Sequence, residues 1–487
     1  MRLPDYPADS YVLPSRAHHY ETSSVQASQN LVNREIGNNT FGGGAWETVL
    51  GPGVLVLLLV AIVLILLVRR KFILGPLMFG LFLLPFGQTL VLGGLHLYVS
   101  RMLIGVALIR AVTSRSFHAP LFGAGYNSID KLFIVWAILR TSAFILRFRE
   151  IGAVVNQAGF LWDVLGGYFL MRILIQDDDD GLRAIKVLSA VAAVLGLTML
   201  YEKLYQVNLY GLLTTAPIIS EVRNGSIRAQ GPFHHAILAG TFGATLLPLF
   251  VWLWKSRRAR SLGLIGMVAS TVITFTAASS TSVSAYAAAI IAICLWPLRN
   301  KMRMIRWGLA IGILMLNFAM HAPVWYALEH VDFAGGSAGP HRAELIDDFV
   351  KHFGDWWLVG TNDNANWGFE TWDISNQYVA EGEVGGLLTF ILFISLLTVC
   401  YSRIGKVRKI IEGENDRRQE WFLWLVGATL FAHTIAFLGI SYFDQSRYAW
   451  VTLLAMISAL TGPKLARATV PVDGLGNLLP RYSSSPR

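Results

Sequence analysis

Long apolar runs separated by short polar connections occupy most of the chain after residue 47. The run PGVLVLLLVAIVLILLV at 52–68 is typical of them. A helix needs roughly 20 apolar residues to cross a hydrocarbon core of about 30 Å, and these runs lack the period-two alternation of a membrane barrel. The pattern therefore predicts an all-α polytopic membrane protein. We expect about 12–13 transmembrane helices, at 50–68, 73–93, 96–112, 131–147, 154–175, 184–200, 235–254, 262–279, 283–298, 306–320, 384–402, 421–440 and 446–462.

Polar segments flank a single membrane domain. We expect a polar N-terminal tail at 1–47, the polytopic domain at 48–462 and a C-terminal tail at 463–487. The chain has no fixed-period repeat that would suggest an array of smaller units.

Basic residues concentrate in short connections, which the positive-inside rule places in the cytoplasm. Threading the chain from them puts two longer segments, 201–234 and 321–383, on the periplasmic face, and leaves the N-terminus outside if all thirteen predicted spans cross. The net charge of +9 is therefore interpreted as topology and not as affinity for nucleic acid. The basic connections are RRK at 69, KSRRAR at 255, RNKMRMIR at 299 and the stretch 403–418.

Composition agrees with the apolar pattern and excludes several kinds of site. The chain is 54% hydrophobic and only 15% charged, unlike a soluble domain. Cys294 and Cys400 lie within apolar runs and suggest neither a disulfide nor a metal framework. The acidic run DDDD at 177–180 threads to the cytoplasmic face, so we assign it no metal or catalytic role.

The outer segment 321–383 is rich in tryptophan and is predicted to be a folded, functional loop. Within it, HRAELIDDFVKHF has apolar residues at helical spacing. Arg342 precedes Leu345 and Ile346 by three and four positions, so it should project from the buried face of that helix. A cation aimed inward needs a partner, which is either a ligand or a nearby carboxylate, Asp347 or Asp348.

A second cationic motif, RAQGPFHH at 228–235, immediately precedes a predicted span. Arg228 offers a planar fork of donors that suits phosphate oxygens, and Gly231 lets the backbone approach a ligand closely. The alternative is an arginine that only anchors the helix at the membrane surface.

Four motifs in order resemble the O-antigen ligase and polysaccharide polymerase superfamily of bacterial inner-membrane proteins. They are RAQGPFHH, SSTSVSAYAAAIIAICLW, HRAELIDDFVKHFGDWWLVG and SNQYVAEGEVGGLLTFILF, and the resemblance covers about 200–460. It implies a fold similar to that of C-type glycosyltransferases, with one large periplasmic loop between late helices. It also implies that Arg228 and Arg342 bind the diphosphate of an undecaprenyl-diphosphate-linked glycan.

Two departures from the family pattern bear on the reaction. The family's histidine-asparagine pair is Ser375-Asn376 here, followed by Tyr378, Glu383 and Gly385. The missing histidine is a candidate base in the ligase branch, so its absence favours a polymerase. The second departure is SSTS at 279–282, where members of the family often carry serine followed by arginine, so one expected cation is absent.

The chemistry implied by the resemblance needs no metal and no cofactor. Undecaprenyl diphosphate is a good leaving group, so positioned arginines can stabilise the charge that develops on it. The expected acids and bases are His235, Glu344 and Glu383, with His234, His341 and Asp373 also open. Side chains expected to contact sugars are Trp356, Trp357, Trp367, Trp372, Asn376 and Tyr378.

The sequence therefore predicts a metal-independent glycosyltransferase of the inner membrane that polymerises repeat units of a surface polysaccharide at the periplasmic face. Its expected partners are the undecaprenyl-diphosphate-linked donor, a glycan or lipid A-core acceptor, the lipid bilayer and other polysaccharide assembly proteins. The alternatives are an O-antigen ligase and a transporter or flippase for lipid-linked sugars. A transporter should carry ionisable residues within its spans, whereas the apolar runs here are mostly free of charge.

Overall fold

The structure is a computed structural model that describes residues 48–92, 95–113, 125–223, 225–256, 259–330, 338–364, 366–368, 371 and 373–468. The predicted N-terminal tail and most of the C-terminal tail lie outside the described residues. The described chain is largely helical and polytopic, as predicted. Five of its helical stretches are long and apolar enough to cross a membrane, namely Asp178–Tyr205, Ala236–Lys255, Trp296–Ala319, Gln377–Gly413 and Gln445–Ala466.

The first half of the chain forms helices α2 to α8 and one hairpin. Their bounds are α2 Pro52–Leu67, α3 Leu74–Leu83, β1 Thr89–Leu92, β2 Leu95–Tyr98, α4 Val99–Thr113, α5 Ser128–Phe148, α6 Ile151–Leu161, α7 Gly167–Leu174 and α8 Asp178–Tyr205. Strands β1 and β2 pair in antiparallel register.

The second half begins with another antiparallel hairpin and continues as helices. The bounds are β3 Glu221–Arg223, β4 Ser226–Arg228, α9 Ala236–Lys255, α10 Arg260–Thr276, α11 Ser280–Cys294, α12 Met302–Ala319, α13 Ala338–Lys351, α14 Phe353–Trp356, α15 Gln377–Gly413, α16 Arg417–Ala436 and α17 Gln445–Ala468. The predicted helix in HRAELIDDFVKHF is confirmed as α13.

The predicted span 73–93 is wrong, because α3 stops at Leu83. Leu84 has extended backbone angles, as expected for a residue that precedes proline. Gly87 then takes a φ of 84° and the chain turns into the β1–β2 hairpin. The ten residues of α3 rise only about 15 Å, which is half the thickness of a hydrocarbon core.

Two other predicted boundaries differ from the structure. The predicted span 154–175 consists of α6 and α7 joined by a π-helical turn at Trp162–Gly166. The predicted span 384–402 lies inside α15, which is 37 residues long and also takes in much of the predicted basic connection 403–418. Gly386 interrupts α15 with a φ of 77°.

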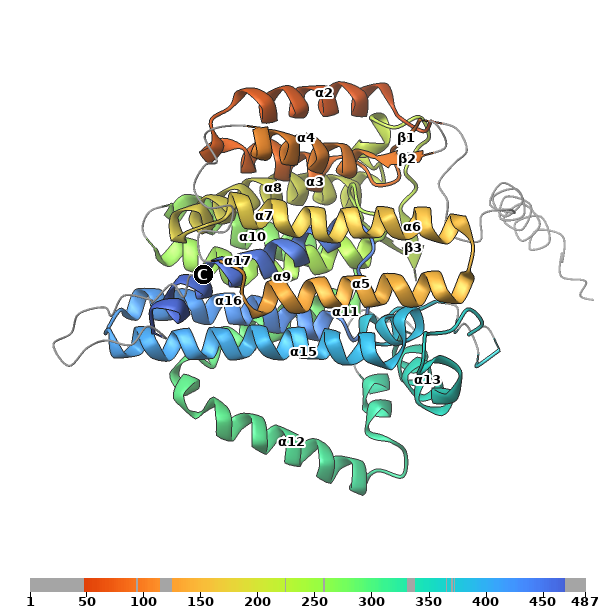
Figure 1. Ribbon diagram of the computed structural model, residues 1–487, viewed down its shortest axis with the longest axis vertical. Helices are drawn as coiled ribbons and strands as arrows, with labels where there is room; N and C mark the ends of the chain where they lie inside the picture. Colours follow the sequence, from red (N-terminus) through yellow and green to blue (C-terminus); the bar gives the residue numbers. More distant parts are fainter. Residues whose placement is uncertain are drawn as a thin grey trace, which may run out of the picture.

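Helix α9 forms the centre of the bundle, and nearly all its side chains are buried (Figure 1). Glycines let its neighbours approach closely: a side chain at Gly243 would meet Ile273 of α10 at 2.6 Å. By contrast, α12 stands apart from the other helices and buries none of its residues (Figure 1). Its apolar surface is the kind that a membrane helix presents to lipid.

The bundle has two distinct ends. Ion pairs gather the basic connections at one, called here the basic end: Arg70 lies 3.5 Å from Asp180, and Arg299 lies 2.8 Å from Glu420. The two hairpins and α13 lie at the other, the hairpin end, on the right of Figure 1. Helix α8 runs from the acidic run at 177–180 to Glu202 beside the RAQG turn, about 36 Å at 1.5 Å per residue.

Candidate active site

Arg228 is the last residue of β4 at the hairpin end, and its side chain is buried although it belongs to a surface hairpin. Its Nη1 donates to Oε2 of Glu221 at 2.7 Å, across the β3–β4 pair. Among the described residues, Arg228 Nε has no hydrogen-bond partner. The Glu221 side chain is 46% exposed, so the cation is fixed while its partner faces water.

The turn after Arg228 is held by a carboxylate at the end of α8. Glu202 is buried and accepts from the backbone amides of Gln230 at 3.1 Å and Gly231 at 2.8 Å. Gly231 has a φ of 58°, and a side chain there would lie 2.8 Å from Leu195. Glycine is therefore required for this turn, which carries the chain from Arg228 to α9.

Two histidines follow, at the start of α9. The rings of His234 and His235 lie 4.5 Å apart and nearly perpendicular, and both face the ring of Phe443. His235 is partly open to solvent, yet the surrounding protein lowers its pKa chiefly by desolvation. The carboxylates of Glu221 and Asp373 act to raise this pKa and Arg228 acts to lower it. His235 is thus disposed to be neutral and able to accept a proton.

Arg342 projects from the buried face of α13, as the sequence predicts, and is only 8% exposed. Its Nη2 donates to the hydroxyl of Thr281 at 2.8 Å. Thr281 belongs to the SSTS motif in the first turn of α11. Of the two carboxylates considered as alternative partners, Asp347 binds Lys351 at 2.5 Å.

The chain between α16 and α17, residues 437–444, links the two arginine positions. The Thr281 hydroxyl donates to the Gly439 carbonyl at 3.2 Å, and Phe443 contacts both histidines. On the other side, His341 Nε2 lies 3.2 Å from the carbonyl of Asp373, whose carboxylate acts on His235. Arg228, His235 and Arg342 therefore belong to one region of the hairpin end.

The other predicted acids and bases lie outside that constellation. Glu344 is exposed on the outer face of α13. Glu383 is buried, and its Oε2 accepts from Asn364 at 3.0 Å while Oε1 has no partner among the described residues. The Glu383 carbonyl accepts from Arg147 at 2.5 Å and from the Thr361 amide at 2.8 Å.

The predicted sugar-binding residues serve mostly in local structure. Trp356 stacks on Phe349 at 3.9 Å, and Trp367 stacks on His352 at 5.0 Å, in a small core beneath α13. Trp357 is 46% exposed, and Trp372 lies outside the described residues.

Asn376 and Tyr378 begin α15. The Asn376 side chain caps the helix by accepting from the amides of Tyr378 and Val379, and it also donates to the Leu438 carbonyl at 3.3 Å. The Tyr378 hydroxyl donates to the Thr434 carbonyl at 2.9 Å. Both side chains therefore have protein partners.

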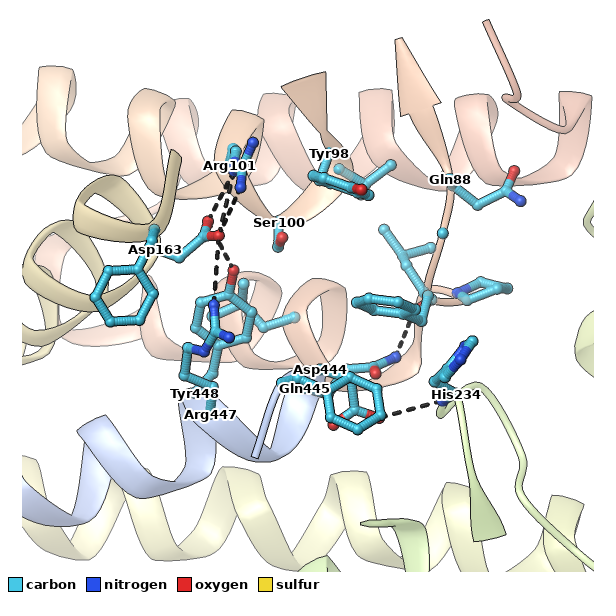
Figure 2. A pocket seen from close by; sticks show the side chains of 18 of the residues that line it. Gln88, Tyr98, Ser100, Arg101, Asp163, His234, Asp444, Gln445, Arg447 and Tyr448 are labelled. Atoms are coloured by element: carbon cyan, nitrogen blue, oxygen red, sulfur yellow. Dashed lines mark hydrogen bonds and ion pairs between the residues drawn. The ribbon is translucent and has the colours of Figure 1, made fainter. Parts of the chain in front are cut away.

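A cavity of about 620 Å³ opens beside His234 between α3, α4, α5, α6 and α17 (Figure 2). Arg101, Arg140 and Arg447 line it, and sequence reasoning overlooks all three. They fall within predicted spans, so those spans carry more charge than their overall apolarity suggests. The signal available in the sequence is an arginine inside an apolar run, which in a membrane protein marks a functional or paired position.

No group of three or more histidine, cysteine, aspartate or glutamate side chains in the described part of the chain could hold a metal ion. No protein-family model matches the sequence, and no curated protein matches it either.

Proposed function

We propose that this protein is a membrane glycosyltransferase that uses a glycan linked to a lipid diphosphate at the hairpin end. The observation that carries the proposal is that two buried arginines, Arg228 and Arg342, lie in one region of the hairpin end although they come from segments far apart in the sequence. Each lies beside the N-terminus of an apolar helix, α9 or α11. Helix N-termini present free amides and partial positive charge, which favour a phosphate group.

In this proposal the guanidinium groups hold the diphosphate while an acceptor hydroxyl attacks the anomeric carbon. The bond from that carbon to the diphosphate oxygen breaks, its electron pair stays on the diphosphate, and the hydroxyl proton passes to neutral His235. Positioned cations stabilise the leaving diphosphate, so the chain's own residues supply the charge that the step requires.

Within this class we favour a polymerase of a periplasmic polysaccharide over a ligase. The position of the ligase branch's candidate base is Ser375 here, and its neighbour Asn376 is used as a helix cap. The positive-inside rule assigns the basic end to the cytoplasm, which puts the proposed site on the periplasmic face of the inner membrane. A transporter remains the alternative of another class, because arginines line the cavity in Figure 2.

The glycan that accumulates in a deletion strain separates these functions. Single repeat units on the lipid carrier or on lipid A indicate a polymerase. Full-length chains on the carrier with none on lipid A indicate a ligase and contradict the polymerase. Repeat units confined to the cytoplasmic leaflet indicate a flippase and contradict both enzymes.

Substitution of the two arginines tests the site directly, with purified protein and lipid-linked donor. We expect Arg228→Ala and Arg342→Ala each to remove most activity while the protein stays folded. Lysine variants should recover only part of it, since losing one charge-assisted hydrogen bond costs roughly 1.5–3 kcal/mol, or about ten- to hundredfold in rate. The double alanine variant should be little worse than the worse single variant, because groups that act as a unit are not additive.

Arg223→Ala is the matched control, since Arg223 belongs to the same hairpin but is 46% exposed and lies 4.0 Å from Glu221. It should retain activity. Near-normal activity of the lysine variants together with additive losses in the double variant would return Arg228 to the role of a membrane anchor.

A further inference from the structure

We propose that the cavity lined by Arg101, Arg140 and Arg447 is a second site for a phosphate group, distinct from the Arg228–Arg342 pair. Resting on the proposed function, we assign this phosphate to the acceptor glycolipid. The acceptor would then be a second phosphate-bearing lipid, held on the opposite side of the His234–His235 pair from the donor.

Two guanidinium groups in this cavity share one aromatic ring. The Arg140 guanidinium carbon lies 4.3 Å from the centre of the Phe160 ring, and that of Arg447 lies 5.4 Å from it. They come from α5 and α17, so the tertiary fold brings two like charges together. Like charges in a partly buried place repel, and an anion bound between them removes that cost.

The carboxylates nearby leave part of this donor capacity unused. Arg101 is well paired, because its Nη2 and Nε lie 2.9 and 3.0 Å from the Asp163 carboxylate. Arg447 forms an ion pair with the same carboxylate at 3.7 Å, drawn as a dashed line in Figure 2, but this distance is too long for a hydrogen bond.

Arg140 also has a donor without an acceptor among the described residues. Its Nε lies 3.5 Å from Glu381 Oε2 and, within the described chain, has no hydrogen-bond partner. The remaining carboxylate of the lining, Asp444, is occupied by the backbone amides of His234 and Ser446 at 3.1 and 2.9 Å. Two guanidinium forks therefore face the cavity with donors to spare, the arrangement that binds phosphate oxygens in pairs.

The rest of the lining suits a glycolipid headgroup better than a bare ion. A volume of about 620 Å³ exceeds what one phosphate needs. The lining combines the aromatic rings of Tyr98 and Phe443 with amides such as Gln88 and Gln445, a mixture suited to binding sugars. His234 lines this cavity, and its neighbour His235 is close enough to Arg228 for the cation to act on its pKa, so a bound acceptor would lie next to the proposed base.

Direct binding tests the inference on full-length protein in phosphatidylcholine nanodiscs, with inorganic diphosphate and geranyl diphosphate as probes. We expect the wild type to bind two equivalents of geranyl diphosphate and the Arg228→Ala/Arg342→Ala variant to bind one. Adding Arg447→Gln should weaken the remaining site about ten- to hundredfold, since a charge-assisted pair of hydrogen bonds is lost. Adding Arg447→Lys, which keeps the charge but loses the fork, should weaken it less.

Arg447→Gln is expected to fold, because Arg101 still pairs with Asp163. Arg149→Gln is the matched control: it removes one exposed charge at the hairpin end without touching the cavity, and should leave the binding unchanged. The second site would be overturned if Arg447→Gln left the remaining binding unchanged. It would also be overturned if the Arg228→Ala/Arg342→Ala variant bound no geranyl diphosphate at all. Binding of inorganic diphosphate alone would overturn the assignment to a lipid.

A failure of the proposed function would give a different binding result from a failure of the cavity site. If Arg447-dependent binding persists but no bound equivalent depends on Arg228 or Arg342, the donor site is wrong and the cavity site stands.

Discussion

The guanidinium of Arg228 already has a carboxylate partner, Glu221. Of these two side chains, Glu221 is the less constrained by its surroundings. Arg228 is buried, whereas Glu221 is 46% exposed on a short hairpin. An incoming diphosphate would compete with Glu221 for the guanidinium. In the proposed site, Glu221 would therefore oppose binding of the donor.

Glu221→Gln should consequently strengthen binding of the donor. An ion pair with one exposed partner contributes about 0.2–1 kcal/mol, so the donor KM should fall by a factor of about 1.4 to 5 while kcat changes little. Glu150→Gln, an exposed carboxylate at the same end of the bundle, should leave KM unchanged. A rise in KM for Glu221→Gln would instead make Glu221 a residue that orients Arg228 for binding.

The direction of the pKa shift of His235 predicts how kcat/KM depends on pH on the acid side. Its lowered pKa favours the neutral form, so the base should be active at neutral pH and kcat/KM should fall only below the pKa of an ordinary histidine. Asp373→Asn removes a carboxylate that raises this pKa, so the fall should move to still lower pH. His321→Gln, an exposed histidine of the outer segment, should change nothing. An acid limb that survives in His235→Gln would assign the base elsewhere.

At the scale of elements, the turn between β4 and α9 is where α8 positions the site. Glu202 at the end of α8 accepts two backbone amides of the turn, and Asn208 donates to the Gly231 carbonyl at 2.8 Å. The direction in which Arg228 projects therefore depends on a helix that begins at the opposite end of the bundle.

A comparison of two glycines in this region distinguishes the effect of backbone strain from that of side-chain crowding. Gly225 and Gly231 both have positive φ, 72° and 58°, but a side chain at Gly225 would meet nothing within 4 Å, whereas one at Gly231 would meet Leu195 at 2.8 Å. Left-handed strain costs about 1–3 kcal/mol. Gly231→Ala should therefore lower thermal stability more than Gly225→Ala and also reduce activity by displacing Arg228. Equal effects of the two variants on melting temperature and activity would show that the contact with Leu195 is unimportant.

At the scale of the whole molecule, four helices start at the end that carries the proposed site. Helices α9, α11, α15 and α17 begin near His235, Thr281, Asn376 and Asp444, which contact one another through the segment 437–444. Their dipoles add partial positive charge at the hairpin end. The acidic run at 177–180 lies at the far end, where Asp180 pairs with Arg70 and Arg183.

Labelling of single cysteines tests this polarity. Cys294 and Cys400 are first replaced by serine and alanine. A cysteine at Gly225 should then react with an impermeant maleimide from the periplasm, whereas one at Asp179 should react only after the inner membrane is opened, because the positive-inside rule predicts a cytoplasmic location for the basic end. The reverse pattern would separate the proposed site from a periplasmic donor.

Local periodicity and charge already determine the helical, membrane-spanning character of the chain, the α13 helix and the inward projection of Arg342. These depend on residues three or four positions apart or on whole apolar runs, which can be read along the chain. The ending of α3 could also have been read, since Pro85 and Gly87 follow it directly.

Only the tertiary structure decides what each charged side chain meets. Arg342 donates to Thr281 and Arg101 to Asp163, both some sixty positions away in the sequence. Arg140 and Arg447 share the Phe160 ring although they belong to the first and last thirds of the chain. Such contacts depend on how helices pack against one another, and a single sequence contains no local signal for that packing. The membrane character therefore follows from sequence alone, whereas the two arginine clusters follow from the fold.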